Sequence, residues 1–244
     1  MCYLKYKLLI FFKFYNNKKK SYGISKKKYY IYVIIIIIIL SICILYYWWL
    51  RKTKKTQILL YDTGRRCDDF INKIKYRNLG KYDEVPHFMV TKIGTIYQLY
   101  DTNFYSRTFN DSVIDKQFIK VAIENLGWLT KNTITGFLSN WIGDPYRSEP
   151  FVRNWRNHYY WDRYIDEQII ATSKLCDHLC DIHGIEKKIV PSQGYIENIV
   201  NFNGVSCKSN FSNIYTDINP SFNFNIFLHL NFLFYLKNIY FFMK

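Results

Sequence analysis

The sequence predicts an α/β protein, in which a globular domain of strands and helices follows a single N-terminal transmembrane helix. Three stretches carry the prediction for the domain: a β-branched run over 118–123, a hairpin pattern over 86–100, and apolar residues at helical spacing over 166–183. The transmembrane helix is predicted from residues 29–50, which contain no charged side chain. With 244 residues and 49% hydrophobic content, the chain is long enough to bury one good-sized core.

Residues 29–50, YYIYVIIIIIILSICILYYWWL, form the predicted membrane anchor. A helix of this length extends about 33 Å, which spans the roughly 30 Å of a bilayer's hydrocarbon core. Aromatic pairs stand at both ends, where interfacial belts are expected. Nine lysines precede the span, so the positive-inside rule predicts a cytoplasmic N-terminus and a single-pass protein whose domain lies on the exoplasmic side. A secretory signal peptide is the alternative, but the apolar run is too long and no small-residue cleavage site follows it.

The net charge of +15 is concentrated at the N-terminus. Residues 1–55 hold 13 of the 34 basic side chains and no acidic one, which leaves 21 basic and 19 acidic side chains in the rest. A globular part that is nearly neutral gives no reason to expect a nucleic-acid partner. We therefore interpret residues 1–28 as a basic cytoplasmic tail that can touch anionic lipid, and residues 51–56 as a linker.

The first elements of the globular domain are predicted to be a strand, a short helix and a hairpin. Residues 58–61 (ILLY) are an apolar run that ends in a glycine turn, and residues 68–76 have the pattern of a short helix. Two apolar segments, 86–91 and 95–100, are separated by three residues that end in Gly94. This spacing predicts a hairpin with a positive φ at that glycine.

Residues 118–129, FIKVAIENLGWL, give the clearest strand pattern in the chain. Branched residues alternate with Lys120, Ala122 and Glu124, so the pattern predicts a buried strand that delivers Glu124 just before a glycine turn. A carboxylate at the rim of a sheet can act as an acid or a base, although a solvated strand end is the plainer interpretation.

Residues 129–164 are expected to form a long, loop-like region rich in aromatic side chains. Its tryptophans either stack on sugars or peptides or pack onto the core. They are Trp141, Trp155 and Trp161. An amphipathic helix is expected next, from about residue 166 to residue 183, with Gly184 as its stop.

The cysteines and the C-terminal segment allow more than one interpretation. Cys176, Cys180 and His183 share one face of the predicted helix and could bind a metal, but free cysteines more often behave as small buried hydrophobes. Residues 225–244 are apolar but interrupted by polar groups, which would be costly in a membrane. This segment either docks on the domain, forms a poorly constrained tail, or crosses the membrane a second time.

Three short motifs occur in a fixed order along the domain. They are PHFMVTKIGTIYQLYD (86–101), VAIENLG (121–127) and YTDINPSF (215–222). Together they resemble the signatures of zinc-dependent N-acetylmuramoyl-L-alanine amidases, the family that also contains the peptidoglycan recognition proteins, and the resemblance covers residues 57–224. It implies a mixed central β-sheet flanked by helices, a zinc ion in a peptidoglycan groove, and hydrolysis of the bond between N-acetylmuramic acid and L-alanine.

The resemblance also implies a role for each matching residue. Tyr61, Cys207 and Asp217 would stand at the zinc ligand positions, Glu124 would be the general base on zinc-bound water, and Tyr215 would stabilise the oxyanion. His87 would lie beside the site. The remaining substrate-binding candidates are the four tryptophans Trp128, Trp141, Trp155 and Trp161.

The departures from the family pattern leave two functions open. The family has histidines where this chain has Tyr61 and Cys207; a thiolate and the carboxylate of Asp217 are credible zinc ligands, whereas a phenol with a pKa of about 10 is a poor one. The first hypothesis is a membrane-anchored amidase that cleaves peptidoglycan. The second is a module that binds glycan or peptide on the same fold without a competent metal. A structural membrane protein that merely inherited the domain is a third possibility.

Overall fold

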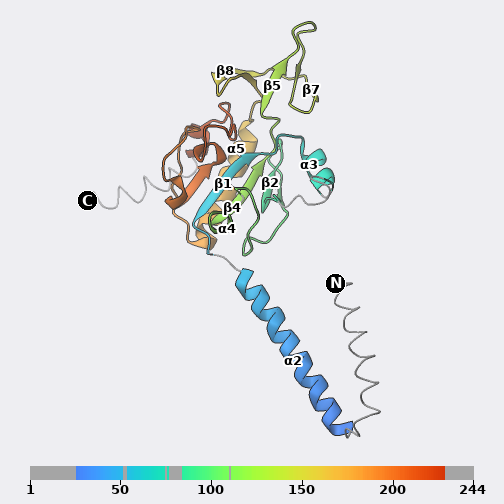
Figure 1. Ribbon diagram of the computed structural model, residues 1–244. Coiled ribbons are helices and arrows are strands. Elements are labelled where there is room, and N and C mark those ends of the chain that lie inside the picture. The colour runs from blue at the N-terminus through green and yellow to red at the C-terminus, as the bar shows by residue number, and fades with distance from the viewer. Residues whose placement is uncertain (1–25, 52–53, 75, 77–83, 110, 229–244) are drawn as a thin grey trace, which may run out of the picture. The chain divides into compact units, whose positions relative to one another are not determined.

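The computed structural model describes residues 26–51, 54–74, 76, 84–109 and 111–228, which fall into two compact units (Figure 1). The first unit is helix α2 (Lys26–Arg51), which includes the whole predicted span 29–50. Across the residues that the structure describes, no helix is found to be long and apolar enough to cross a membrane. Most of the predicted tail, residues 1–25, lies outside the described residues, and the membrane anchor stays a prediction.

The second unit is built on a mixed sheet of five described strands in the order β10–β1–β4–β2–β3. Its strands are β1 (Gln57–Asp62), β2 (Phe88–Val90), β3 (Ile96–Gln98), β4 (Phe118–Ile123) and β10 (Gly204–Cys207). β1 runs parallel to both β10 and β4, β4 runs parallel to β2, and β3 returns antiparallel to β2. The hairpin that joins β2 and β3 is confirmed, with φ +81° at Gly94.

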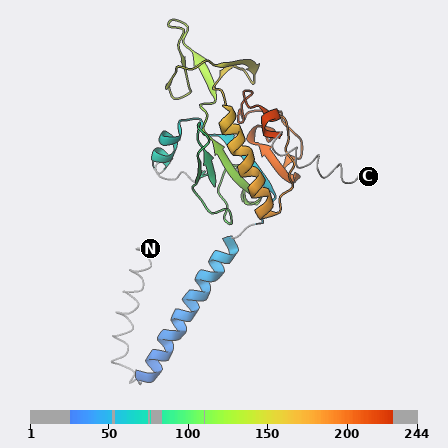
Figure 2. The ribbon, with the colours of Figure 1, turned by 180° about the vertical axis from the view of Figure 1, so that it is seen from behind.

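Helices lie on both faces of this sheet, which confirms the predicted α/β class. The long helix α5 (Asp166–His183) packs on one face, as Figure 2 shows, and the short helix α3 (Cys67–Lys73) packs on the other. Successive strand residues point to opposite faces, so Leu60 joins the core under α5 while Tyr61 joins the cluster under α3. Gly184 ends α5 in a left-handed conformation, as the sequence predicted.

Residues 128–161 form a second, antiparallel sheet, so the prediction of a long loop was wrong. The described strands are β5 (Trp128–Lys131), β6 (Leu138–Ser139), β7 (Pro145–Tyr146), β8 (Phe151–Trp155) and β9 (His158–Trp161). Their order is β7–β6–β5–β9–β8. Strands of two to five residues are too short to show an alternating pattern, although their aromatic content favours strands.

Strand β4 is buried on both faces, which the alternation of its sequence did not predict. Lys120 is fully buried and pairs with Asp115, at the end of the short helix α4 (Ser112–Lys116), with Nζ and Oδ1 3.0 Å apart. Lys120 Nζ also donates to the carbonyl of Ser106, and Asp115 accepts the Thr108 N–H at 3.0 Å. These bonds hold the segment before β4 against the sheet.

The beginning of the C-terminal segment packs on the domain. Phe227 is fully buried in the core under α5, and Ser173 of that helix donates to its carbonyl at 3.0 Å. This contact favours docking for the first residues of the predicted segment 225–244. Residues 229–244 lie outside the described residues.

Candidate functional site

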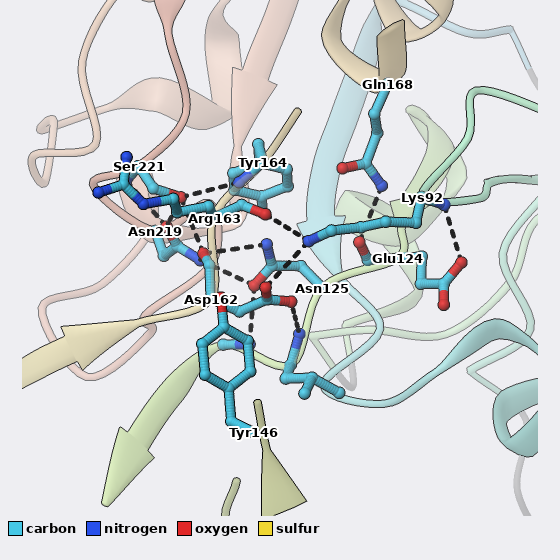
Figure 3. Close-up of polar contacts among 12 residues, drawn as sticks. Lys92, Glu124, Asn125, Tyr146, Asp162, Arg163, Tyr164, Gln168, Asn219 and Ser221 are labelled. Carbon is cyan, nitrogen blue, oxygen red and sulfur yellow. Dashed lines mark hydrogen bonds and ion pairs between the residues drawn. The ribbon is translucent and has the colours of Figure 1, made fainter. Parts of the chain in front are cut away.

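Polar side chains collect at the carboxyl ends of β1 and β4. Glu124 directly follows β4, and its Oε2 accepts the backbone N–H of Lys92 at 2.8 Å. Gln168, in the first turn of α5, donates from Nε2 to the carbonyl of Glu124 at 2.8 Å (Figure 3). The hairpin and the long helix therefore fix both the backbone and the carboxylate of Glu124.

A cavity of about 190 Å³ opens beside Glu124. Its lining comes from the end of β4, the β2–β3 turn, the start of α3 and the second sheet: Arg66, Lys92, Glu124, Asn125, Leu126, Tyr146, Arg147, Ser148 and Asp162. Burial, together with the nearby carboxylate of Asp162, raises the pKa of Tyr146 to about 12. At neutral pH its phenol is therefore protonated, and it donates to the carbonyl of Glu149 at 3.3 Å.

Asp162 connects this cavity to the rest of the domain. Its Oδ1 accepts from Lys92 Nζ at 2.9 Å, and its Oδ2 accepts the Leu126 N–H at 2.9 Å (Figure 3). Lys92 also donates to the carbonyl of Arg163. The side chain of Lys92 is thus held against the segment that follows β9, while its backbone N–H holds Glu124.

An asparagine network brings the second and third motifs together. Asn125 Oδ1 accepts from Asn219 Nδ2 and from the Gly127 N–H, each at 2.8 Å. Asn219 and Ser221 both donate to the carbonyl of Asp162, at 3.2 and 2.9 Å (Figure 3). The motifs VAIENLG and YTDINPSF, which lie far apart in the sequence, therefore meet at one edge of the sheet.

Three of the residues predicted for the zinc chemistry surround the ammonium group of Lys208. Lys208 Nζ lies 3.7 Å from Asp217 Oδ2, 5.0 Å from the ring centre of Tyr215 and 5.7 Å from that of Tyr61. Burial raises the pKa of Asp217, whereas the charge and hydrogen bond of Lys208 and the charge of Arg156 act in the opposite direction. The structure thus brings these residues together, but around a lysine.

The remaining predicted ligand, Cys207, lies on the other face of the sheet. Cys207 is paired in register with Leu60, and both belong to the core under α5. Tyr61 belongs to the cluster under α3. Burial, and to a lesser degree the nearby carboxyl of Asp62, raises the pKa of the Cys207 thiol, so it stays protonated at neutral pH.

As placed here, the three predicted ligands do not fit one zinc ion. Tyr61 and Cys207 point away from each other across the sheet, and the carboxylate of Asp217 is already paired with an ammonium group. Within the described part of the chain, no three His, Cys, Asp or Glu side chains are grouped as a metal site would require. The zinc ion stays a prediction from the resemblance.

Asp62, at the end of β1, is a site residue that the sequence reasoning missed. It is 6% exposed, and neither of its carboxylate oxygens has a hydrogen-bond partner among the described residues. Burial raises its pKa well above the ordinary value, and the charges of Asp217 and Asp162 add to this. The signal was its position at the end of the ILLYD run, next to Tyr61.

His87 and three of the four tryptophans pack against other side chains of the domain, and their predicted part in substrate binding stays a prediction. His87 is fully buried; its Nδ1 accepts the Lys120 N–H at 2.9 Å, and burial lowers its pKa to about 3, so the ring is neutral. Trp161 is fully buried and packs against Trp155, while Trp128 stacks on the ring of His158 with centres 4.5 Å apart.

Trp141 differs from the other three tryptophans because 52% of its surface is exposed. Its Nε1 donates to the carbonyl of Gly64 at 3.0 Å, and the guanidinium of Arg65 lies 5.0 Å from the ring centre. The second sheet is thereby attached to the turn that follows β1. Of the four predicted substrate-binding tryptophans, Trp141 is the most exposed.

Comparisons with known proteins give similar structures but no sequence family. No protein-family model matches the chain, and no curated protein matches it. Among solved structures, the amidase AmiD from E. coli is 13% identical, with a TM-score of 0.37 over 55% of this chain and 46% of that chain. The amidase LysC from Clostridium intestinale is 11% identical, with a TM-score of 0.39 over 72% and 85%.

AmpDH3 from Pseudomonas aeruginosa, solved in complex with anhydromuramic pentapeptide, is 10% identical, with a TM-score of 0.44 over 73% of this chain and 60% of that chain. The AmiD structure was solved with its substrate, anhydro-N-acetylmuramic acid-L-Ala-D-gamma-Glu-L-Lys. The chain spans less than two thirds of either of these two proteins.

Proposed function

We propose that this chain recognises fragments of peptidoglycan through the cavity bounded by Glu124, Tyr146 and Asp162. The observation that carries the proposal is the location of this cavity. It lies at the end of β4, where the amidase-like motif VAIENLG supplies Glu124, and the motif YTDINPSF is tied to the same edge through Asn219. The first motif, through Lys92, and the second, through Glu124, therefore line this cavity, and the third is bonded to the second beside it.

The side chains of the cavity suit the groups of a muropeptide. A peptide stem offers carboxylates and amides, and its sugar offers hydroxyl groups. Arg66 and Arg147 can bind a carboxylate through charge-assisted hydrogen bonds, and the phenol oxygen of Tyr146, whose proton is donated to the carbonyl of Glu149, can accept from an amide or a hydroxyl group. Glu124 can accept from an amide or a hydroxyl group. The cavity can thus pair with each kind of polar group in such a ligand.

Hydrolysis of the bond between N-acetylmuramic acid and L-alanine is the second candidate, and the position of Glu124 favours it. A carboxylate held by the Lys92 N–H at 2.8 Å and facing a cavity can take a proton from water. In the amidase family that the motifs resemble, a zinc ion would activate that water. Because the predicted ligands do not converge, we place recognition before hydrolysis.

We also propose that α2 anchors the domain to a membrane, with the domain on the exoplasmic side. In support, most isoleucines of α2 between residues 34 and 44 are exposed, by 45–58%. Exposed apolar side chains in such number are costly in water. Extraction of membranes at high pH should leave the chain in the pellet, and external protease should digest the domain; release into the supernatant would contradict the anchor.

Recognition is tested by co-sedimentation of the full-length chain, in mild detergent, with purified peptidoglycan. We expect Arg147→Ala to reduce the bound fraction, and Arg153→Ala, an exposed arginine of β8 outside the cavity lining, to leave it unchanged. The soluble fraction is analysed by mass spectrometry for stem peptides with a free L-alanine amino group. Hydrolysis would be established if the wild type releases such peptides and Glu124→Gln does not. No sedimentation and no product would refute both functions.

A further inference from the structure

We propose that the ammonium group of Lys208 is a built-in cation that takes the place of a divalent metal at this end of the sheet. The inference deepens the proposed function, on which it rests for the identity of the site. It predicts that the domain neither holds zinc nor needs it to bind peptidoglycan. The proposal is carried by the contacts of Lys208 and by the faces of the sheet on which the predicted ligands lie.

The surroundings of Lys208 suit a cation. The carboxylate of Asp217 lies 3.7 Å from Nζ, and the ring centres of Tyr215 and Tyr61 lie at 5.0 and 5.7 Å, within the range of a cation–π contact. The side chain of Lys208 is 16% exposed, so water screens these contacts only in part. One carboxylate and two ring faces neutralise and stabilise a single positive charge.

The backbone fixes Lys208 in this place. It directly follows β10, and because Cys207 points into the core under α5, Lys208 is directed to the Tyr61 side. The Cys207 N–H donates to Asn210 Oδ1 at 2.7 Å. The Ser209 N–H donates to the carbonyl of Asp217, which ties the lysine and its carboxylate partner together.

A zinc ion would compete poorly for this place. Catalytic zinc takes three protein ligands from imidazole, thiolate and carboxylate, whereas the groups gathered here around the ammonium of Lys208 are one carboxylate and two phenol rings. A divalent ion close to Lys208 would be repelled by it. The thiol of Cys207, which could otherwise help, is buried on the opposite face.

The test compares zinc binding by the full-length chain in detergent with that of two variants. Lys208→Met removes the charge and keeps the length, and Lys187→Met removes a comparable partly exposed, ion-paired lysine that follows α5. After dialysis against zinc chloride, we expect no zinc above the buffer level in the wild type and no change in its Tm on chelation. Lys208→Met leaves the carboxylate of Asp217 without its ammonium partner, so a zinc ion that neutralises this carboxylate should raise the Tm of Lys208→Met more than that of the wild type or of Lys187→Met.

One zinc per wild-type chain, with a Tm that falls on chelation, would overturn the proposal even if Lys208→Met fails to fold. Equal zinc-induced shifts in all three proteins would also overturn it. Co-sedimentation with peptidoglycan is measured in parallel, with and without chelator. Sedimentation lost on chelation contradicts the built-in cation, whereas no sedimentation under either condition contradicts the proposed function and leaves the zinc result to decide this inference.

Discussion

Replacing Asp62 by asparagine should stabilise the domain at alkaline pH. The carboxyl is 6% exposed and has no hydrogen-bond partner among the described residues, and the charges of Asp217 and Asp162 disfavour its ionised form. A buried polar group without a partner costs about 1–3 kcal/mol, and an ionised one costs more. The Asp62→Asn substitution keeps a buried polar group of the same shape and removes only the added cost of ionisation, which is about 1.4 kcal/mol for each unit by which the pKa is raised, so we expect the free energy of unfolding to rise by at least about 1 kcal/mol at pH 8.

The sign of the pH dependence follows from the raised pKa of Asp62. Folding holds the proton on this carboxyl, so the wild type loses stability as the pH rises from the pKa of the unfolded state through the higher pKa of the folded state. The Asp62→Asn variant lacks this loss. The difference in unfolding free energy between the two proteins should therefore be small at pH 4 and grow towards pH 8.

Chemical denaturation of the full-length chain in detergent, at several pH values, measures this difference. Asp68→Asn, at an exposed position of α3, is the matched control and should show no pH-dependent gain. An Asp62→Asn protein that is less stable than the wild type at pH 8 would refute the reasoning, and so would a gain that is the same at every pH. The first result would mean that other interactions stabilise the Asp62 carboxylate, and the second that the gain does not come from its ionisation.

Three further sets of substitutions test the packing and the site. Lys120→Met leaves the buried carboxylate of Asp115 without its ammonium partner, so the unfolding free energy should fall by about 3–5 kcal/mol; a loss below about 1 kcal/mol in denaturant titrations would contradict a buried ion pair. Asp162→Asn removes the charge that Lys92 pairs with and should reduce both the stability of the domain and its sedimentation with peptidoglycan. Unchanged sedimentation would mean that Asp162 is not needed for binding. Trp161→Ala should lower the free energy of unfolding by about 3–5 kcal/mol, because the side chain is fully buried. Trp141→Ala should reduce sedimentation with little loss of stability, because this side chain is exposed. The reverse pattern would contradict both expectations.

The elements with strong periodic patterns were predictable from the sequence. Strand β4, the β2–β3 hairpin and helix α5 were all confirmed, because each has a regular apolar spacing and a glycine close to its end or turn. The second sheet was missed because its strands are short and pair through tight turns, one of which uses the left-handed residues Arg156 and Asn157. Local pairing of this kind leaves little periodicity to read.

The site was only partly predictable, because its geometry depends on the register of the strands and on the face of the sheet to which each side chain points. The position of Glu124 at the end of β4 could be read from the chain. That Tyr61 and Cys207 point to opposite faces follows from the pairing of Leu60 with Cys207, which joins strands that lie far apart in the sequence. The same pairing brings Lys208 to the side of the sheet where Tyr61 lies. Contacts between distant segments of this kind are not encoded in any local pattern.

Recognition through the cavity is tested most directly by isothermal titration calorimetry, in which a soluble muropeptide is titrated into the full-length chain. The wild type, Arg147→Ala and Arg153→Ala are compared in the presence and absence of chelator. We expect the wild type and Arg153→Ala to bind with an affinity that chelation does not change, and Arg147→Ala to bind more weakly. Equal binding by all three proteins, or no binding by the wild type, would contradict recognition through this cavity.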